Sequence, residues 1–253
     1  MIKTIDINCD LGESIQPNDW ARDAELMPYI SSCNIACGGH AGNENSIRVS
    51  IQNAKSHRLA VGAHPSYPDK ENFGRQSMTL SEKALRSTLK EQINKVQNGC
   101  RQQSIELHHI KPHGALYNDA ATDLALAKII AEEIATVSSS IKYMGLAESA
   151  MLDAAKAVGV DFIHEGFMDR NYQKNKALVP RTEPHALHAN LEDSLEQALS
   201  FAQNRAITLP DGEKLSITVD SICLHGDNPN ALQIAQKLQQ LFQHHNIDIS
   251  LGH

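Results

Sequence analysis

The amino-acid sequence predicts an α/β fold, a closed (β/α) barrel of seven strands laid out like a TIM barrel. Apolar, β-branched runs alternate with helical stretches along the chain, which is typical of βα units and a largely parallel sheet. Polar residues also end nearly every predicted strand. All strand ends of a barrel meet at one mouth, whereas an open doubly wound sheet, the alternative, gathers only those at its crevice.

Seven runs are the predicted strands: residues 5–8, 32–37, 59–64, 105–111, 141–146, 160–167 and 215–227. In the stretch "DINCDLGE", which begins within the first run, Asp6, Asn8 and Asp10 share one face and the residues between them are apolar. A half-buried surface strand would alternate in the same way. Strands of an all-parallel sheet are covered on both faces, however, so carboxylates buried there need partners or a task.

Amphipathic helices are predicted between the strands. In residues 81–99 the apolar side chains recur three or four positions apart, Ser81 is placed to cap the start, and Gly99 suits a left-handed end. Further apolar faces are formed by Leu126, Ile130, Ile134 and Val137, by Met151, Ala154, Ala155 and Val158 before Gly159, and by Ile234, Leu238 and Leu241.

The composition favours one domain covering residues 1–253, because 41% of the residues are hydrophobic and no linker interrupts the chain. No apolar run approaches the roughly 20 residues of a membrane helix, and the charged N-terminus lacks a secretory pattern. We therefore expect a cytoplasmic protein without a membrane partner. With a net charge of -7 and no basic block, nucleic acid is not an expected partner either.

The five cysteines predict reduced thiols rather than a disulfide framework. Cys33, Cys37 and His40 could be a zinc cluster, but no matching downstream pair follows, so buried structural thiols are favoured. The neighbouring stretch "ACGGHAGNENS" is rich in glycine yet is no phosphate-binding loop, since neither G-x-x-x-x-G-K-[ST] nor a strand-linked G-x-G-x-x-G occurs. The chain has no recognisable ATP site of its own.

Residues suited to chemistry cluster at the predicted strand ends. His64, in "VGAHPSYPD", has a side chain whose ordinary pKa suits proton transfer near neutrality. Arg75, in "NFGR", could grip a carboxylate, or could be a solvated surface arginine. Asp169 beside Arg170, in "EGFMDRNY", could form a structural ion pair. The stretch "CLHGDNP" adds His225 and Asp227, with Pro229 opening the next helix.

The stretch "KPHGALYN" concentrates polar groups just after a predicted strand. Lys111 and His113 share parity and should both point into the barrel mouth, while Pro112 ends the strand and Gly114 permits a turn. A buried lysine could serve as base or oxyanion stabiliser, or could stay charged and hold a ligand carboxylate. No G-x-S-x-G or H-E-x-x-H motif occurs, which leaves acid/base or weakly metal-assisted hydrolysis.

Seven motifs in order, "DINCDLGES", "ACGGHAG", "GAHPSYPD", "FGR", "KPHGALYN", "DRNY" and "LHGDNP", closely resemble the LamB/YcsF family. The resemblance implies a barrel of the glycoside hydrolase/deacetylase type. It also implies the A subunit of an ATP-dependent 5-oxoprolinase, which hydrolyses the lactam 5-oxo-L-proline to L-glutamate with partner subunits B and C. ATP would be bound with or by those partners, and a divalent metal is left open.

The resemblance also implies site residues. The catalytic set is Asp10, Glu13, His40, His64, Lys111 and His113. The substrate-binding set is Asn8, Arg75, Tyr117, Asn118, Asp169, Arg170 and His225. Within these sets a carboxylate or histidine would activate water, Lys111 would stabilise the developing negative charge, and Arg75 or Arg170 would grip the substrate carboxylate.

Departures from the family pattern accompany the resemblance. Asn43 stands where members of the family usually have Asp, Gly39 where they have Phe, and "NFGRQ" where they have "GFGRR". The loss of a carboxylate at residue 43 argues against a metal site there.

Two alternatives stay open. One is a metal-dependent amidohydrolase resembling polysaccharide deacetylases, with Asp10, His40 and His64 as ligands of a water-activating ion. The other is a non-catalytic subunit whose polar rim binds a lactam or sugar.

Overall fold

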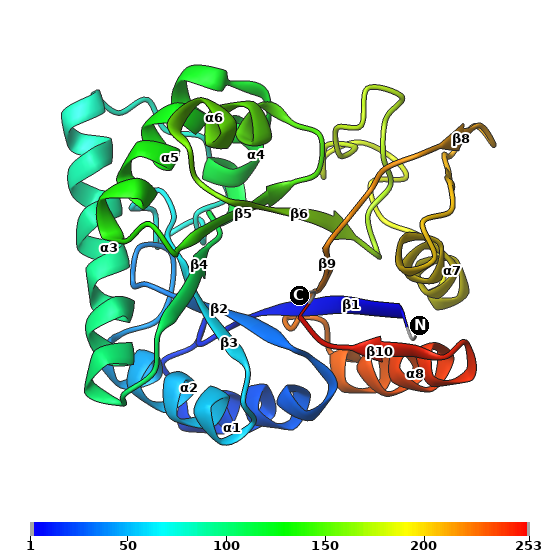
Figure 1. Cartoon of the computed structure of the whole chain (residues 1–253), viewed down its shortest axis with the longest axis horizontal. Helices are drawn as coiled ribbons and strands as arrows, with labels where there is room; N and C mark the ends of the chain where they lie inside the picture. Colours follow the sequence, from blue (N-terminus) through cyan, green and yellow to red (C-terminus); the bar gives the residue numbers. More distant parts are fainter. Residues whose placement is uncertain (1–2, 252–253) are drawn as a thin grey trace.

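A computed structural model describes residues 3–251, in which seven parallel strands close into a barrel (Figure 1). The barrel strands are β1 (Lys3–Leu11), β2 (Ser32–Ala36), β3 (Ala60–His64), β4 (Leu107–Ile110), β5 (Lys142–Leu146), β6 (Phe162–Phe167) and β9 (Ser221–Leu224). Each strand pairs with the next, and β9 pairs with both β6 and β1. The predicted seven-stranded barrel is thus confirmed, and the open-sheet alternative is wrong.

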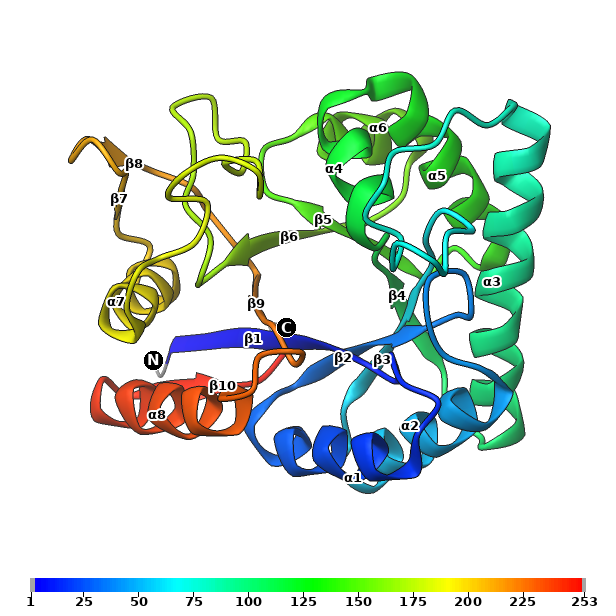
Figure 2. The same cartoon turned by 180° about the vertical axis from the view of Figure 1, so that it is seen from behind.

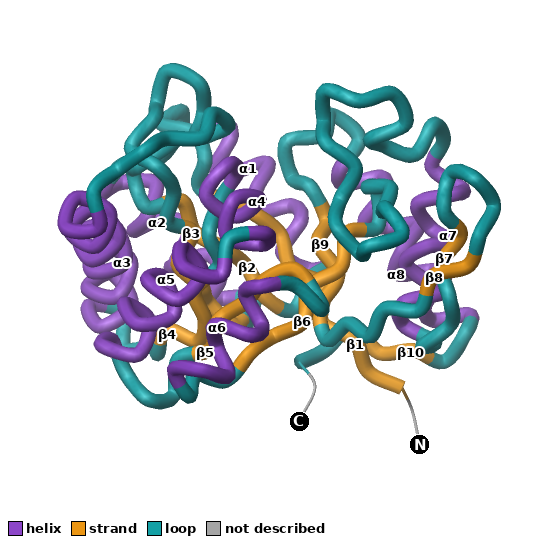
Figure 3. Tube along the Cα trace, turned by 90° about the horizontal axis from the view of Figure 1, so that it is seen from above, coloured by secondary structure: helices purple, strands orange, loops and turns teal. Residues whose placement is uncertain are grey.

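Helices surround the strands, and the view from behind shows the same arrangement (Figure 2). They are α1 (Pro17–Leu26), α2 (Glu44–Ser56), α3 (Glu82–Gln102), α4 (Gly114–Thr122), α5 (Leu124–Val137), α6 (Ala150–Val158), α7 (Leu191–Ala202) and α8 (Ala231–His244), with a short 3-10 helix η1 (Met27–Tyr29) after α1. Seen from above, α2, α3 and α5 lie on one side of the strands and α7 and α8 on the other (Figure 3). None of these helices, within residues 3–251, combines the length and the apolar character needed to cross a bilayer.

Local signals in the sequence set several helix ends. The Ser81 side chain accepts a hydrogen bond from the Ala84 amide at the start of α3, as predicted. Gly159 ends α6 with a φ of 84°, in the left-handed region that glycine tolerates. Gly99, in contrast, does not end its helix, because α3 continues to Gln102. A Cβ at Gly99 would lie 2.6 Å from Cδ1 of Ile51, so this glycine lets α2 and α3 pack closely.

Three short strands were not predicted. β10 (Ile247–Ile249) extends the sheet beside the first residues of β1. β7 (Ile207–Thr208) and β8 (Lys214–Leu215) form a separate antiparallel pair. The predicted strand at residues 215–227 is therefore too long, since only Ser221–Leu224 joins the barrel. Pro229 lies two residues before α8 rather than opening it.

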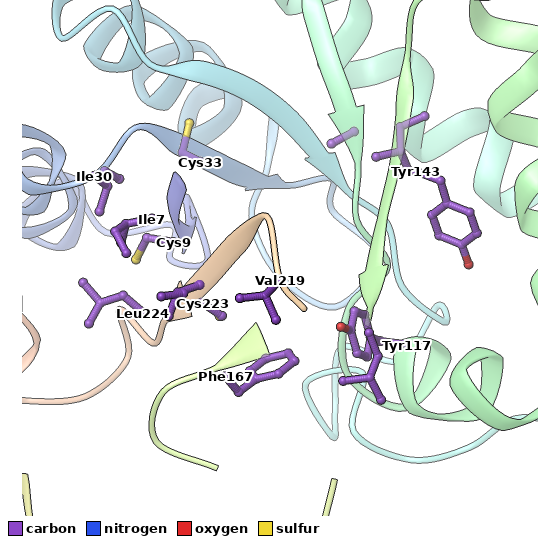
Figure 4. Close-up of a cluster of buried hydrophobic side chains, with 14 of the residues drawn as sticks. Ile7, Cys9, Ile30, Cys33, Tyr117, Tyr143, Phe167, Val219, Cys223 and Leu224 are labelled. Carbon is purple, nitrogen blue, oxygen red and sulfur yellow. The ribbon is translucent and has the colours of Figure 1, made fainter. Parts of the chain in front are cut away.

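The apolar core lies between the outward faces of the strands and the helices. Figure 4 shows Ile7 and Cys9 of β1 close to Ile30 and Leu224. All five cysteines are buried and free, which confirms the prediction of structural thiols without disulfides. Because the outward faces supply this core, the inward faces are left for the polar side chains.

Candidate functional site

The lower part of the barrel interior is a closed hydrogen-bond network on the even-numbered face of β1. Asp6 accepts hydrogen bonds from the hydroxyls of Ser31, Ser32 and Ser221. Burial raises the pKa of Asp6, which these hydrogen bonds only partly counter. Asn8 donates to the Ser221 hydroxyl at 2.8 Å. The inward direction of this face agrees with the predicted alternation of β1.

Lys111 lies above this network and is 2% exposed. Its Nζ is 2.7 Å from Oε1 of Glu165, 3.0 Å from Oδ1 of Asp10 and 3.1 Å from Oδ1 of Asn8. Burial by itself would lower the pKa of Lys111, but Asp10 and the other acidic neighbours raise it well above its usual value.

An ammonium group has three N–H donors, and Lys111 donates them to Oδ1 of Asn8, Oδ1 of Asp10 and, at 3.5 Å, Sγ of Cys223, while Glu165 contacts it as an ion pair. Lys111 therefore has no donor left for a developing oxyanion, and the geometry favours a role in holding Asp10 and Glu165 in place. The side chain of Asn8 is fully buried, and its polar atoms contact Ser221, Asn34 and Lys111. Asn8 therefore lies beneath the barrel mouth rather than in it.

Four acceptor atoms converge above Lys111, from Asp10, Glu13, His64 and His113. Nε2 of His64 lies 3.3 Å from Oδ2 of Asp10 and 3.0 Å from Nδ1 of His113, and that atom lies 3.5 Å from Oε1 of Glu13. One ligand atom from each residue lies within 4.8 Å of the other three. The two strand ends that supply the histidines, after β3 and β4, are neighbours in the barrel, which explains why residues 49 apart meet.

The remaining ring nitrogens fix the tautomers of the two histidines. Nδ1 of His64 lies 2.8 Å from the Lys111 carbonyl oxygen, and Nε2 of His113 lies 2.9 Å from the Phe73 carbonyl oxygen. A carbonyl can only accept, so both of these nitrogens carry a hydrogen and donate. In the neutral rings, the lone pairs then lie on the two nitrogens that face each other.

His40 is adjacent to this cluster but is not one of the converging groups. Its ring stacks on His113 with the centroids 3.7 Å apart, and its Nε2 lies 3.0 Å from Oε1 of Glu13. Burial, with a contribution from His64, lowers the pKa of His40 to about 2 and that of His113 to about 3. The alternative ligand set Asp10, His40 and His64 is therefore not the set that the fold brings together.

Asp169 and His225 form a second pair across the mouth. Nδ1 of His225 donates to Oδ2 of Asp169 at 2.7 Å, and the ring stacks on Phe167. Burial by itself would lower the pKa of His225, but the charge and the hydrogen bond of Asp169 raise it. The anticipated Asp169–Arg170 ion pair is wrong, because Arg170 donates instead to the carbonyls of Val179 and Ala186.

A cavity of about 610 Å³ connects the two groups, and its lining includes Asp10, Glu13, His64, Lys111, His113 and His225. Tyr117, Asn118, Arg170 and Arg181 also line it. Arg75 lies at its edge, where its guanidinium pairs with Asp227 at 3.0 Å. Most predicted site residues thus surround one space, whereas Asn8 lies beneath it, His40 lies beside it, and Asp169 is absent from the lining and is linked to the cavity through His225.

Sequence reasoning missed three parts of the site. Asn34 donates to Asn8 and Asp10, and it accepts from Nε2 of His109 at 2.6 Å. Glu165, whose carboxylate pairs with Lys111, was not among the predicted site residues. The polar residues Ser32 and Asn34 alternate with apolar ones in β2, a signal that could have found them as it found the polar face of β1.

Asn43 has a structural task. Its side chain accepts the backbone N–H groups of Asn45 and Ser46, and the Ser46 hydroxyl accepts the N–H of Asn43. This capping box starts α2, and residue 43 is not among the four converging ligands. The departure from Asp at this position therefore does not remove a ligand from the cluster.

Known proteins resemble this chain over almost its whole length. The sequence profile of the LamB/YcsF family matches residues 5–252. The A subunit of 5-oxoprolinase from Bacillus cereus (strain B4264) is 39% identical over 98% of this chain and 98% of its own. The protein of the same name from Neisseria meningitidis (strain MC58) is 41% identical over 94% of this chain and 96% of its own. The crystal structure of a lactam utilization protein from Thermus thermophilus superposes with a TM-score of 0.92 at 30% identity, covering 98% and 100% of the two chains. This chain therefore belongs to the LamB/YcsF family.

Proposed function

We propose that this chain is the A subunit of a 5-oxoprolinase and opens the lactam ring of 5-oxo-L-proline to give L-glutamate. The observation that carries the proposal is a cavity in which a cluster of carboxylates and histidines faces a histidine–aspartate pair. Relatives about 40% identical over nearly the full length, which are named for this activity, support it.

The reaction needs two proton transfers. The water oxygen bonds to the lactam carbonyl carbon, the ring C–N bond breaks, and the nitrogen leaves with an added proton. Glu13 is suited to accept the proton of water, because burial and the nearby charge of Asp10 raise its pKa. His225 is suited to supply the proton to nitrogen, because Asp169 holds its Nδ1–H and leaves Nε2 on the cavity side.

The substrate carboxylate needs a cationic partner. Arg170 is occupied by two backbone carbonyls and Arg75 by Asp227. Arg181 lines the cavity, and it forms no ion pair within residues 3–251. Its guanidinium lies 3.3 Å from Nε2 of His225 and can only donate, so its transfer to the substrate carboxylate would free Nε2 to carry the proton. Arg181 is therefore the best placed of the three to bind the carboxylate beside the proton donor.

ATP and the partner subunits complete the reaction. A five-membered lactam is a stable amide, and transfer of the terminal phosphoryl group of ATP to its oxygen, which leaves ADP, would make the ring carbon a better electrophile. Water addition and cleavage of the C–N bond would then give an acyl phosphate, and a second water molecule would hydrolyse it to L-glutamate and phosphate. The chain has no phosphate-binding loop motif, so we assign ATP binding and that phosphorylation to the partner subunits B and C.

The test is glutamate release from 5-oxoproline by this chain, alone and with subunits B and C, with and without ATP. Release should require both ATP and the partners. In the complete complex His225→Gln should lower kcat about 100-fold or more, whereas Lys95→Gln, on the exposed face of α3, should leave it unchanged. Release by the isolated chain without ATP, abolished by a chelator, would contradict the proposal and favour the metal-dependent amidohydrolase.

A further inference from the structure

The cluster above Lys111 lacks a hydrogen-bond donor between its converging atoms. Nδ1 of His64 and Nε2 of His113 already donate to backbone carbonyls, so the two nitrogens 3.0 Å apart both present lone pairs in the neutral rings. Oδ2 of Asp10 also faces Nε2 of His64. Two ring nitrogens and a carboxylate oxygen directed at one point attract a positive centre, which is either a proton on one of the nitrogens or a metal ion between them.

The charges around the cluster point in the same direction. The buried Lys111 is shared between Asp10 and Glu165, so one cation faces two carboxylates. Glu13 adds a third carboxylate, and within residues 3–251 its charged-group contacts are limited to His40 and His113. A cation at the cluster would balance this excess of negative charge.

The spacing fits a metal ion. A tetrahedral site with metal–ligand bonds of about 2.0–2.1 Å has edges of about 3.3–3.4 Å between its ligand atoms. Two edges of the Asp10–His64–His113 set are close to this length, 3.0 Å between the two histidine nitrogens and 3.3 Å from His64 to Asp10, and all of its ligand atoms lie within 4.8 Å of one another.

The surroundings of each ligand are also those of metal ligands. Metal-bound histidines usually donate their other N–H to a carbonyl or carboxylate, as both of these do. The second oxygen of Asp10 accepts from Lys111 at 3.0 Å and from Asn34 at 2.8 Å, which fixes the carboxylate with Oδ2 toward the histidines. Three protein ligands beside an open cavity are typical of a catalytic rather than a structural metal site.

We propose that Asp10, His64 and His113 bind one divalent transition-metal ion, with Glu13 beside its open, cavity-facing position. Two imidazole nitrogens and a carboxylate favour Zn²⁺, Co²⁺ or Ni²⁺ over Mg²⁺, which prefers oxygen ligands. A water molecule at the open position would lie next to Glu13, the group that accepts its proton in the proposed hydrolysis.

Metal binding is measured directly on the full chain after dialysis against a chelator, by calorimetry with Zn²⁺ and by visible absorption with Co²⁺. One ion should bind per chain, tightly enough to saturate at micromolar concentration, and Mg²⁺ should not compete. An ion-to-chain ratio near zero, or Zn²⁺ affinity no better than that for Mg²⁺, would overturn the proposal whatever the variants do.

Variants assign the ligands. His113→Gln and Asp10→Asn should each weaken Zn²⁺ binding about 100-fold or more, while His225→Gln, across the cavity, should change it less than about threefold. His40→Gln separates the two ligand sets, because it should retain the Co²⁺ spectrum of the unmodified chain. A spectrum lost in His40→Gln and kept in His113→Gln would overturn the assignment.

Circular dichroism of each metal-free variant establishes that it is folded, and the Zn²⁺ result for the unmodified chain stands even if a variant does not fold. Because these measurements use no 5-oxoproline, a failure of metal binding is distinct from a failure of oxoproline hydrolysis.

Discussion

Lys111 Nζ lies 2.7 Å from Oε1 of Glu165, and the Glu165 side chain has no exposed surface. Removing one partner of a buried ion pair leaves an uncompensated charge, so Lys111→Met should destabilise the chain by about 3–5 kcal/mol. Lys111→Met combined with Glu165→Gln should cost less than the sum of the single changes. Urea unfolding of the double-mutant cycle measures this coupling.

Lys95→Met is the matched control for this cycle, because Lys95 pairs with Glu91 on the exposed surface of α3. It should cost less than about 1 kcal/mol. Additive costs for Lys111→Met and Glu165→Gln would mean that the two buried groups are not coupled. In the complete enzyme, Lys111→Met should abolish glutamate release, since Asp10 loses the cation that positions it.

The His225–Asp169 pair predicts a stability change with pH. The pKa of His225 is raised above 6.5, so its contribution is fully present below pH 6.5 and is lost as the pH rises through the folded-state value. Burial alone would raise the pKa of Asp169, but His225 holds this pKa below 3.8. The contribution of the Asp169 carboxylate to folding stability is therefore lost only in acid. The pair should be strongest between about pH 4 and 6.5.

His225→Gln should therefore lose more stability at about pH 5.5 than at about pH 8.5, as measured by urea unfolding at both values. His57→Gln, at an exposed helix end, serves as the control and should show no such difference. An equal loss for His225→Gln at the two pH values would show that the pair does not carry this linkage.

Alanine substitutions at two glycines with positive φ distinguish the cost of a left-handed backbone from the cost of a steric clash. Gly114, at the start of α4, has a φ of +58°, and a Cβ there would lie 2.4 Å from the Gly74 carbonyl oxygen. Gly159 has a φ of +84°, and a Cβ there would meet no atom of the described chain within 4 Å. Gly159→Ala should cost about 1–2 kcal/mol from the left-handed conformation alone.

Gly114→Ala should cost about 1–3 kcal/mol more than Gly159→Ala, because the Gly74 carbonyl must move. Thermal or urea unfolding of the two variants gives the difference directly. Similar costs at both positions would contradict the close contact between α4 and the loop that carries Phe73, whose carbonyl holds His113.

The cap of α2 predicts the effect of changes at residue 43. Asn43→Ala should cost about 1 kcal/mol, since two backbone N–H groups lose their acceptor. Asn43→Asp should change stability by less than about 0.5 kcal/mol, because a carboxylate accepts the same hydrogen bonds near the positive end of the helix. The unfolding free energies of both variants test this prediction. An equal loss of stability in Asn43→Asp and Asn43→Ala would exclude the capping role of Asn43.

Much of the site could be predicted from local patterns. Alternation along β1 placed Asp6 and Asp10 on the inward face, and the shared parity of Lys111 and His113 placed both in the mouth. These inferences succeeded because a side chain in or next to a strand points to a face fixed by its position. The carboxyl ends of parallel strands also converge in any closed barrel.

The partners of these side chains could not be predicted in the same way. Arg170 adjoins Asp169 in the chain, yet Asp169 pairs with His225, which lies 56 residues further on. The metal-ligand set considered from the sequence contained His40 and not His113, whereas in the structure it is the His113 ring nitrogen that faces His64. Short-range patterns give the face of a strand, but not the distance between atoms on different strands.

Residue periodicity and local capping encode the alternation of strands and helices, the closed barrel and the inward direction of the polar faces, so the order of the amino acids was enough to predict them. Only the folded chain reveals that Lys111 donates to Asn8, Asp10 and Cys223 while it pairs with Glu165, and that the free nitrogens of His64 and His113 face each other. The reason is physical: hydrogen-bond saturation and ligand geometry depend on tenths of an ångström between residues far apart in the chain, and barrel closure fixes those distances.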